Sequence, residues 1–294
     1  MITPADKLRE LLQQPGMIVM PCCFDALSAR LIEQAGFALT FMSGFGVSAA
    51  RIGLPDTGLI SYGEMVDQGR NICAAVSIPV IGDADTGYGN ALNVRRTVHG
   101  FARAGFAALM IEDQLSPKRC GHTRGKSVVD RDEACMRVQA AVDTRDQGED
   151  ILILARTDAR ATHGLDEALA RARMFAELGA DILFVEAPRS EREMQTICGG
   201  LPGPLMVNML EGGQTPLLSP DQLKRMGFKI AAFPLTLLSA SMQAMKKSLI
   251  SLREHGRPAA DLMPFDELKK LVGFDEYYDA ESRYANKPRF DIKK

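Results

Sequence analysis

Short apolar runs alternate with longer amphipathic stretches along most of the chain. The apolar runs are almost continuous, which is typical of parallel strands covered on both faces. The stretches between them have the spacing of surface helices. The predicted strands are Met17–Met20, Ala38–Met42, Pro79–Gly82, Ala108–Ile111, Ile151–Ala155, Ile182–Val185, Pro204–Val207 and Lys229–Phe233.

Three of the intervening stretches carry the clearest helix signals. Residues 91–103 place apolar side chains at amphipathic spacing, namely Leu92, Val94, Val98 and Phe101. A second helix is predicted over Asp166–Glu177, with Gly179 as the residue just past its end. Ser219 before Pro220 indicates a third helix, because Ser is a preferred N-cap and Pro suits the first helical position.

Eight strands alternating with helices predict an α/β fold, a (β/α)8 TIM-type barrel. A doubly wound open sheet is the alternative, and the lack of a GxGxxG motif after any strand disfavours its dinucleotide-binding form. We expect residues 1–258 to form the catalytic barrel. The polar, helix-like residues 259–294 are expected to form an extension outside it.

Composition and charge exclude several classes of function. The chain has 294 residues, 46% of them hydrophobic, and a net charge of −2 without a basic stripe, so no nucleic-acid partner is expected. No apolar stretch approaches the roughly 20 residues that span a bilayer, so we expect no membrane partner. Six scattered cysteines without a CxxC pair, and no signal-peptide pattern, favour reduced thiols in the cytoplasm.

Polar residues follow six of the eight apolar runs directly. Active sites of such barrels lie at the carboxyl ends of the strands, so these residues are candidates for catalysis. They could instead be helix N-caps or turn residues, although Glu and Arg are poor caps. The residues are Ser43, Asp83, Asp85, Glu112, Asp113, Arg156, Asp158, Glu186 and Asn208.

Three of these carboxylates, Asp83, Asp85 and Glu112, come from neighbouring strand ends. They would repel one another unless a cation neutralised them. Oxygen ligands without a His or Cys cluster favour Mg²⁺, or Mn²⁺, over Zn²⁺. Because Mg²⁺ keeps several waters, part of this group should act through water. The alternative is ion pairing with Arg156 or Lys118.

The loop after the fourth strand, residues 113–126, is long for a connection of this kind and is expected to act as a lid. It carries Cys120 beside Lys118, Arg119 and His122, a field expected to lower the pKa of the thiol. Such a thiol suits proton transfer or nucleophilic attack. The alternative is an exposed basic loop with an incidental cysteine. The other five cysteines are expected in the core.

Four motifs together resemble the isocitrate lyase / phosphoenolpyruvate mutase superfamily, over about residues 5–256. They are Lys-Arg-Cys-Gly-His at 118–122, Asp-Ala-Asp-Thr-Gly-Tyr-Gly at 83–89, Gly-Leu-Pro-Asp-Thr-Gly at 53–58 and Ala-Arg-Thr-Asp at 155–158. The cysteine loop is similar to that of the lyase branch, which cleaves the C2–C3 bond of 2-hydroxy dicarboxylates. The mutase and decarboxylase branches usually lack this cysteine.

The resemblance implies a division of labour among the candidates. Asp83 would bind Mg²⁺ directly, and Asp56, Asp85 and Glu112 would act mostly through bound water. Cys120 would be the general acid, supported by Lys118 and His122. Arg156 and Glu186 complete the catalytic set. The residues implied to bind substrate are Ser43, Gly44, Phe45, Gly121 and Asn208. The resemblance also implies a tetramer whose subunits exchange a C-terminal helix, so we expect a homotetramer with swapped C-terminal helices.

Departures from the family pattern bear on the substrate. Residues 208–213 replace a "TEFG"-like segment typical of isocitrate and 2-methylisocitrate lyases, and Phe41 stands where those enzymes tend to have Tyr. The chain is more similar to the branch that cleaves 2-alkylmalates. The absent Tyr leaves the general base open among Glu186, Tyr88 and a hydroxide on the metal.

These observations predict a Mg²⁺-dependent carbon–carbon lyase that splits a dicarboxylate such as 2,3-dimethylmalate into pyruvate and propionate. The alternatives are a 2-methylisocitrate lyase, for which Arg124 could bind the third carboxylate, an oxaloacetate hydrolase and a phosphonate mutase. A catalytically silent barrel that only binds a dicarboxylate is a more remote alternative.

Overall fold

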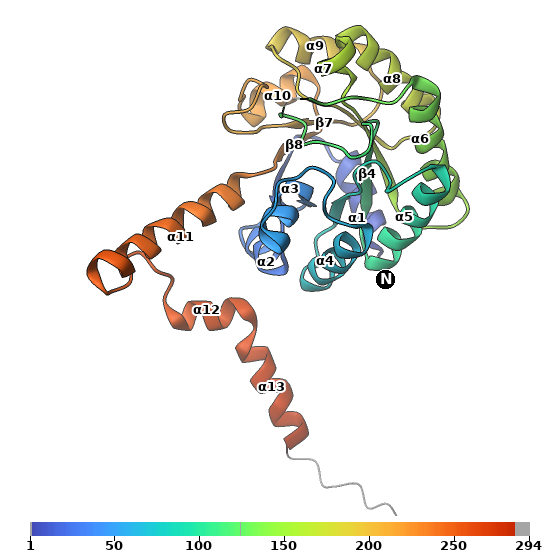
Figure 1. The fold of residues 1–294 in the computed structure, drawn as a ribbon. Helices are drawn as coiled ribbons and strands as arrows, with labels where there is room; N and C mark the ends of the chain where they lie inside the picture. The colour runs from blue at the N-terminus through green and yellow to red at the C-terminus, as the bar shows by residue number, and fades with distance from the viewer. Residues whose placement is uncertain (1, 124, 286–294) are drawn as a thin grey trace, which may run out of the picture. The chain divides into compact units, whose positions relative to one another are not determined.

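Eight parallel strands pair in chain order and close into a barrel in which β1 lies beside β8 (Figure 1). The structure is a computed structural model and describes residues 2–123 and 125–285. The predicted (β/α)8 barrel is therefore confirmed, and the open-sheet alternative is wrong. The strands are β1 Ile18–Cys23, β2 Thr40–Met42, β3 Val80–Asp83, β4 Ala108–Glu112, β5 Leu152–Thr157, β6 Ile182–Val185, β7 Leu205–Asn208 and β8 Ile230–Phe233.

Several strands continue past their apolar runs into the polar residues that follow. β3 takes in Asp83, β4 takes in Glu112, β5 takes in Arg156 and β7 takes in Asn208. The main-chain pairing between β4 and β5 extends as far as these polar residues, since Glu112 pairs with Arg156. These four side chains therefore sit on rigid strands rather than on loops, which holds a site more precisely.

Helices cover the outside of the barrel, and the three predicted from sequence are α5, α8 and α10. Ser219 caps α10 by accepting a hydrogen bond from the Gln222 N–H, and Gly179 has φ +99° just after α8. Leu92 does not belong to the buried face of α5, because its side chain is 72% exposed. The helices of the barrel are α1 Pro4–Gln13, α2 Ala26–Gln34, α3 Gly44–Val47, the π-helical η1 Ser48–Ile52, α4 Tyr62–Ala75, α5 Ala91–Ala104, α6 Arg131–Asp146, α7 Ala159–His163, α8 Leu165–Glu177, α9 Glu191–Gly200 and α10 Pro220–Met226.

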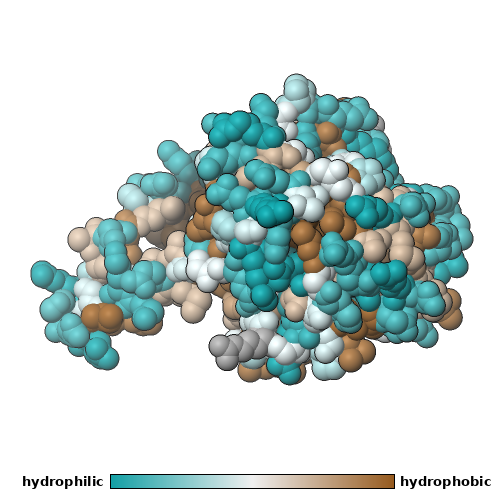
Figure 2. Space-filling view, turned by 90° about the horizontal axis from the view of Figure 1, so that it is seen from above, coloured by the Kyte–Doolittle hydropathy of each residue, from teal (hydrophilic) through white to brown (hydrophobic). Residues whose placement is uncertain are grey.

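The chain divides into two compact units, the first ending at Ala240 and the second beginning at Ser241, within α11 (Thr236–His255). The second unit contains the remainder of α11 followed by α12 (Phe265–Val272) and α13 (Phe274–Ala285). Within the part of the chain that the structure describes, no helix has the length and apolar character needed to cross a membrane. Hydrophilic side chains cover much of the face seen in Figure 2, with smaller hydrophobic areas between them.

The core has two layers because successive strand residues point to opposite faces. In β4, Ala108 and Met110 belong to the cluster inside the barrel, whereas Leu109 and Ile111 pack outward against the helices. The inner cluster also includes Ala5 and Leu8 of α1. α1 therefore closes the amino-terminal end of the barrel, and the opposite end is left for the site.

We predict that Leu8→Ala destabilises the protein by about 2–5 kcal/mol, the usual cost of removing a fully buried leucine side chain. Leu8 is 0% exposed. The free energy of unfolding is measured by urea denaturation. The control is Ile2→Ala, at a position 61% exposed, which should stay within about 0.5 kcal/mol of the wild type. Equal effects of the two substitutions would contradict the role given to α1.

Candidate active site

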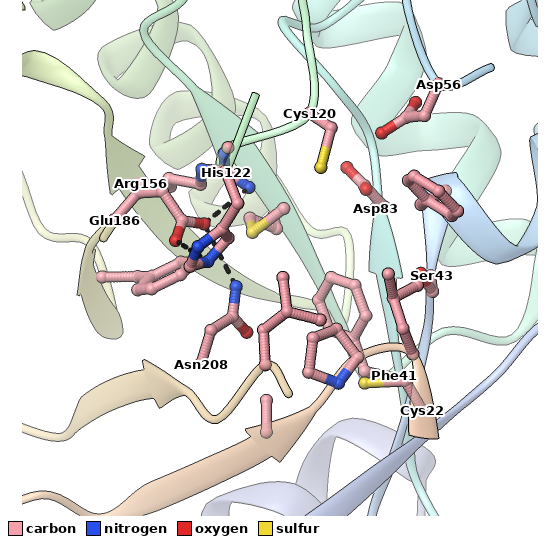
Figure 3. Close-up of a pocket in the computed structure, with 18 of the residues that line it drawn as sticks. Cys22, Phe41, Ser43, Asp56, Asp83, Cys120, His122, Arg156, Glu186 and Asn208 are labelled. Carbon is pink, nitrogen blue, oxygen red and sulfur yellow. Dashed lines mark hydrogen bonds and ion pairs between the residues drawn. The ribbon is translucent and has the colours of Figure 1, made fainter. Parts of the chain in front are cut away.

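A cavity of about 580 Å³, counted with its open mouth, lies at the carboxyl ends of the strands (Figure 3). Most of the predicted site residues line it, and they come from β2, β3, β5, β6, β7 and the loops beside them. Gly44, Asp85 and Glu112 stand behind this lining and contact residues within it. The predicted residues in the lining are Ser43, Phe45, Asp56, Asp83, Lys118, Cys120, Gly121, His122, Arg156, Glu186 and Asn208.

Asp83 is held by main-chain donors on both carboxylate oxygens. The N–H of Gly44 donates to its Oδ2 at 3.1 Å, and the N–H of Asp85 donates to its Oδ1 at 3.1 Å. A Cβ on Gly44 would lie 2.5 Å from that Oδ2, so the contact requires glycine. Ser43 accepts a hydrogen bond from the Gly46 N–H at 3.2 Å and thus also serves as an N-cap, as the alternative reading allowed.

Lys118 joins the lid to the acidic residues. Its Nζ lies 2.6 Å from Asp56 Oδ1 and 2.9 Å from Asp85 Oδ1, and all three side chains are buried. Burial raises the pKa of Asp85 to about 7; Lys118 opposes the rise, and Asp83 and Asp56 add to it. The structure therefore shows the ion pairing that sequence analysis gave as the alternative for this group.

The acidic group nevertheless has the chemistry of a site for a hard divalent cation. Four buried carboxylates share the mouth, and Lys118 neutralises only part of their charge. Glu112 Oε1 is buried and accepts no hydrogen bond from the described residues. Among those residues, no three His, Cys, Asp or Glu side chains stand ready as direct metal ligands. A cation here would take one or two carboxylates directly and reach the others through water.

Arg156 is the positive centre of the opposite wall. Its Nε lies 2.7 Å from Asp158 Oδ2 and 3.2 Å from Glu112 Oε2, and its NH1 lies 3.3 Å from Glu186 Oε2. The guanidinium also packs 5.4 Å from the centre of the Phe184 ring. Burial opposes its charge, but these three carboxylates outweigh burial and hold the pKa of Arg156 well above its ordinary value.

Glu186 is surrounded by donors. The Ala187 N–H donates to its Oε1 at 2.9 Å from a left-handed backbone conformation, φ +55°, and Asn208 Nδ2 donates to its Oε2 at 3.1 Å. His122 Nε2 lies 3.0 Å from Oε1. Burial alone would raise the pKa of Glu186, but Arg156 and His122 outweigh it and the pKa is lowered. Glu186 is therefore a poor candidate for the general base.

The predicted lid is clamped at its base. Gln114 pairs with Val128 in an antiparallel bridge, and the Leu115 N–H donates to the Ser127 carbonyl at 2.9 Å. The Gln114 side chain donates to the Arg119 carbonyl at 2.8 Å and accepts from the Arg119 N–H at 2.9 Å. Sequence analysis did not identify Gln114, because a glutamine in a loop carries no signal by itself. Residues 115–123 and 125–127 thus belong to a folded flap.

The tip of the lid rests on the barrel. The Gln214 N–H donates to His122 Nδ1 at 3.2 Å, and the other ring nitrogen, Nε2, lies 3.0 Å from Glu186 Oε1. A Cβ on Gly121 would lie 2.5 Å from Arg156 NH2, so only glycine allows this approach. Residues 208–213, read from sequence as a departure from the family pattern, lead directly to this contact.

The expectation of a lowered thiol pKa at Cys120 is wrong. Burial raises the pKa of Cys120, Asp56 and Glu186 raise it further, and a backbone hydrogen bond from His122 and the charge of Arg156 only partly oppose the rise. The flanking Lys118 is neutralised by its carboxylate partners, which sequence proximity did not reveal. Cys120 is therefore a neutral thiol near pH 7, a proton donor rather than a nucleophile.

A sequence model described as phosphoenolpyruvate phosphomutase matches residues 8–253. The chain belongs to this family. The predicted resemblance to the isocitrate lyase / phosphoenolpyruvate mutase superfamily is therefore confirmed.

Relatives with different names share most of the chain's length. The chain is 44% identical to a chloroplastic carboxyvinyl-carboxyphosphonate phosphorylmutase of Arabidopsis thaliana, over 95% of this chain and 84% of that protein. It is 42% identical to a 2,3-dimethylmalate lyase of Eubacterium barkeri, over 96% and 98%. It is 40% identical to a 2-methylisocitrate lyase of Aeropyrum pernix, over 94% and 86%.

Solved structures of the superfamily have the same fold. A crystal structure of 2,3-dimethylmalate lyase is 39% identical, has a TM-score of 0.92 and covers 100% of this chain and 99% of its own. A phosphonopyruvate hydrolase in complex with oxalate and Mg²⁺ is 28% identical, has a TM-score of 0.86 and covers 97% and 100%.

Sequence analysis assigned no site role to most apolar residues of the lining, and it named Phe41 only as a departure from the family pattern. Phe41, Met110, Phe184 and Met206 each line the cavity two positions before a polar strand-end residue. The two-residue period of a strand places both on the same, inward face, so this signal was available. Cys22, expected in the core, also lines the cavity. Tyr88 stands outside the lining, which argues against it as the base.

We predict that Cys120 reacts slowly with iodoacetamide at pH 7 and that the rate rises with pH and has not reached its plateau at pH 9, the ordinary thiol pKa. The raised pKa keeps the thiol protonated through neutral pH, and the thiolate, which is the reactive form, appears as the pH passes that pKa. Peptide mass spectrometry assigns the label, with Cys120→Ser as the blank. A rate already at its plateau at pH 7 would contradict the assignment of a neutral thiol.

Proposed function

We propose that the protein is a Mg²⁺-dependent carbon–carbon lyase that cleaves 2,3-dimethylmalate, or a close 2-alkylmalate, to pyruvate and a short carboxylic acid such as propionate. The observation that carries the proposal is the position of Cys120. Its neutral thiol lies on a closed lid above a cavity that has a charged wall and an apolar wall. The named lyases among the relatives support the same reaction.

The charged wall suits the 2-hydroxy acid end of the substrate. Asp83 and Lys118 stand on one side of the cavity and Arg156 on the other. Arg156 would bind the carboxylate that becomes that of pyruvate, together with the Ser43 hydroxyl and the main chain at Gly44 and Phe45. A guanidinium binds a planar carboxylate through paired hydrogen bonds, which orients as well as attracts it.

The apolar wall suits alkyl groups rather than a third carboxylate. It contains aromatic, Met and Leu side chains, which stabilise buried methyl groups by contact and by exclusion of water. Among the described basic residues of the lining, Lys118, His122 and Arg156 are each engaged by carboxylates, and Arg119 is the fourth. Arg124, the candidate for binding a third carboxylate, lies outside the described residues. The apolar residues of the lining are Cys22, Phe41, Phe45, Met110, Phe184, Met206, Leu210, Ala232, Pro234 and Leu235.

In the reaction the hydroxyl proton passes to solvent, the electron pair that it leaves on oxygen forms the C2=O bond of pyruvate, and the C2–C3 bond breaks with its electron pair left at C3. Cys120 would donate its proton to C3 to complete propionate, a step that requires the thiol form. Lys118 and the His122–Glu186 pair would hold the lid over the site, which keeps the reactive carbanion from bulk water. Glu186, with its lowered pKa, would stabilise that arrangement and not accept the hydroxyl proton.

Asp83 would hold the cation directly, with Asp56, Asp85 and Glu112 around it. When bound, Mg²⁺ or Mn²⁺ would polarise the substrate hydroxyl and lower its pKa. The Mg²⁺ complex of the phosphonopyruvate hydrolase supports this choice of metal.

We expect Mg²⁺-dependent release of pyruvate from 2,3-dimethylmalate, measured by coupling to lactate dehydrogenase and abolished by EDTA. Cys120→Ser should lower kcat by about 10²- to 10⁴-fold, the usual contribution of a general acid. Cys135→Ser, on α6 outside the lining, is the matched control and should retain activity.

The comparison substrates are 2-methylisocitrate, oxaloacetate and phosphonopyruvate. Preference for 2-methylisocitrate would establish the alternative function of a 2-methylisocitrate lyase, which is the name of the Aeropyrum relative. Phosphonopyruvate turnover that survives Cys120→Ser would establish mutase or hydrolase chemistry instead. Binding of 2,3-dimethylmalate without turnover of any substrate would leave only a dicarboxylate-binding barrel.

We further propose a homotetramer that exchanges C-terminal helices, in the cytoplasm. An apolar groove on the outside of the barrel unit supports the exchange. It lies beside α2, β1 and β8 and is lined by Val19, Pro21, Leu31, Ile32, Ala35, Phe37, Phe233 and Leu237, with Thr236. In α11 the apolar residues Leu238, Met242, Met245, Leu249 and Leu252 recur at alternating spacings of four and three, a stripe that suits such a groove. The six free cysteines support a reducing compartment.

Leu249→Glu should shift the protein toward smaller species, because a buried glutamate charge in the apolar stripe is strongly disfavoured. Light scattering after size exclusion gives the mass. Lys247→Glu, at an exposed neighbouring position on the same helix, controls for charge. An unchanged mass for Leu249→Glu, or a monomeric wild type, would refute the exchange.

A further inference from the structure

Lys126 ties the lid to the barrel at a point outside the catalytic set described above. Its Nζ donates to the carbonyl of Gly121, at the tip of the lid, and to Asp158 Oδ1 at 2.7 Å. The Lys126 side chain is 4% exposed and that of Asp158 is 0% exposed. A buried ammonium is costly unless it is paired, so these contacts require the lid to be in place over the barrel.

Asp158 is a fixed anchor at the end of β5. Its main-chain N–H donates to Asp113 Oδ1 at 2.9 Å, and Asp113 is also held by Thr157 Oγ1 at 2.6 Å and Arg171 NH1 at 3.1 Å. Its carboxylate accepts two hydrogen bonds from Arg156, one from Nε at 2.7 Å and one from NH2 at 3.1 Å. Lys126 therefore adds a second cation to a carboxylate already paired with Arg156.

The charges around Arg156 show why the second cation matters. Three buried carboxylates, Asp158, Glu112 and Glu186, share this one guanidinium. A substrate carboxylate would add a fourth negative charge. Lys126 brings a positive charge to the same cluster only when the lid is closed, because it lies on the lid. Closure of the lid therefore places the positive charge of Lys126 near Arg156 when an anion is bound there.

We infer that Lys126 is a positioning residue that couples closure of the lid to the binding of an anionic substrate by Arg156. Closure and anion binding then favour each other, since the positive charge that closure brings attracts the anion and the bound anion in turn attracts Lys126. The inference rests on the proposed function for the identity of the anion, but the position of the lid can be followed without turnover.

The test is alkylation of Cys120 by iodoacetamide in the full-length protein, with and without oxalate and Mg²⁺. Rates are measured across pH 7–10 so that a change in the thiol pKa is separated from a change in access. The variants are Lys126→Met and Lys126→Arg. Gly121→Ala, whose Cβ would meet Arg156, provides an open-lid reference. Lys229→Met is the matched control, because Lys229 also donates to two main-chain carbonyls but at the opposite end of the barrel.

We expect Lys126→Met to raise the ligand-free rate about tenfold, toward that of Gly121→Ala, and to lose most of the protection that oxalate gives the wild type. This magnitude is within the usual range of coupling between two sites. Lys126→Arg should restore most of the protection, and Lys229→Met should behave as the wild type. Labelling of Cys23, which is buried in the core outside the cavity lining, reports unfolding and should stay unchanged.

Wild-type rates and full oxalate protection in Lys126→Met would overturn the inference, as would equal labelling of Cys23 and Cys120. The proposed function fails separately, by a lack of pyruvate release from the wild type. In that case the ligand-free rates of Lys126→Met and the wild type still decide whether Lys126 holds the lid.

Discussion

The buried guanidinium of Arg156 organises the mouth of the barrel. It reaches carboxylates from its own strand, from the neighbouring strand β4 and from β6, so three elements are joined through one charge. Loss of this guanidinium would leave buried carboxylates without a positive partner. The free-energy cost of that loss is much larger than the net stabilisation that the intact ion pairs provide. The lid adds to the same arrangement, because Gly121 passes close to the guanidinium and His122 meets Glu186. Fold, lid and substrate recognition therefore share one electrostatic centre.

The fold could be predicted from sequence because both of its periodicities are local. Continuous apolar runs such as Ile182–Val185 are typical of strands covered on both faces, and eight of them in alternation with helices predict the barrel. The exact strand ends could not be predicted, because β5 continues through Arg156 and Thr157 as long as its neighbours provide hydrogen-bond partners. That pairing is a property of the closed sheet and is not encoded in the apolar run.

The sequence predicts which polar residues form the site, but it does not predict their ion pairs or the directions of their pKa shifts. Strand-end position identifies residues such as Asp83 and Glu186, and the cysteine motif identifies the lid. The pKa direction at Cys120 could not be predicted, because it depends on which carboxylates neutralise Lys118 and on how deeply the thiol is buried. Lys126 and Gln114 were missed for a related reason. Their roles come from contacts with distant main-chain and carboxylate groups, which have no local pattern.

The plug formed by α1 has a kinetic consequence. With Ala5 and Leu8 packed into the inner core, the amino-terminal end of the barrel is sealed by side chains. With this end closed by described side chains, material held in the cavity would leave at the opposite end, beneath the flap. Two products made there must leave in sequence, with the fragment nearer the opening departing first and the deeper one after it. The opening frequency of the flap would thus set a ceiling on turnover, whatever the speed of the bond-breaking step.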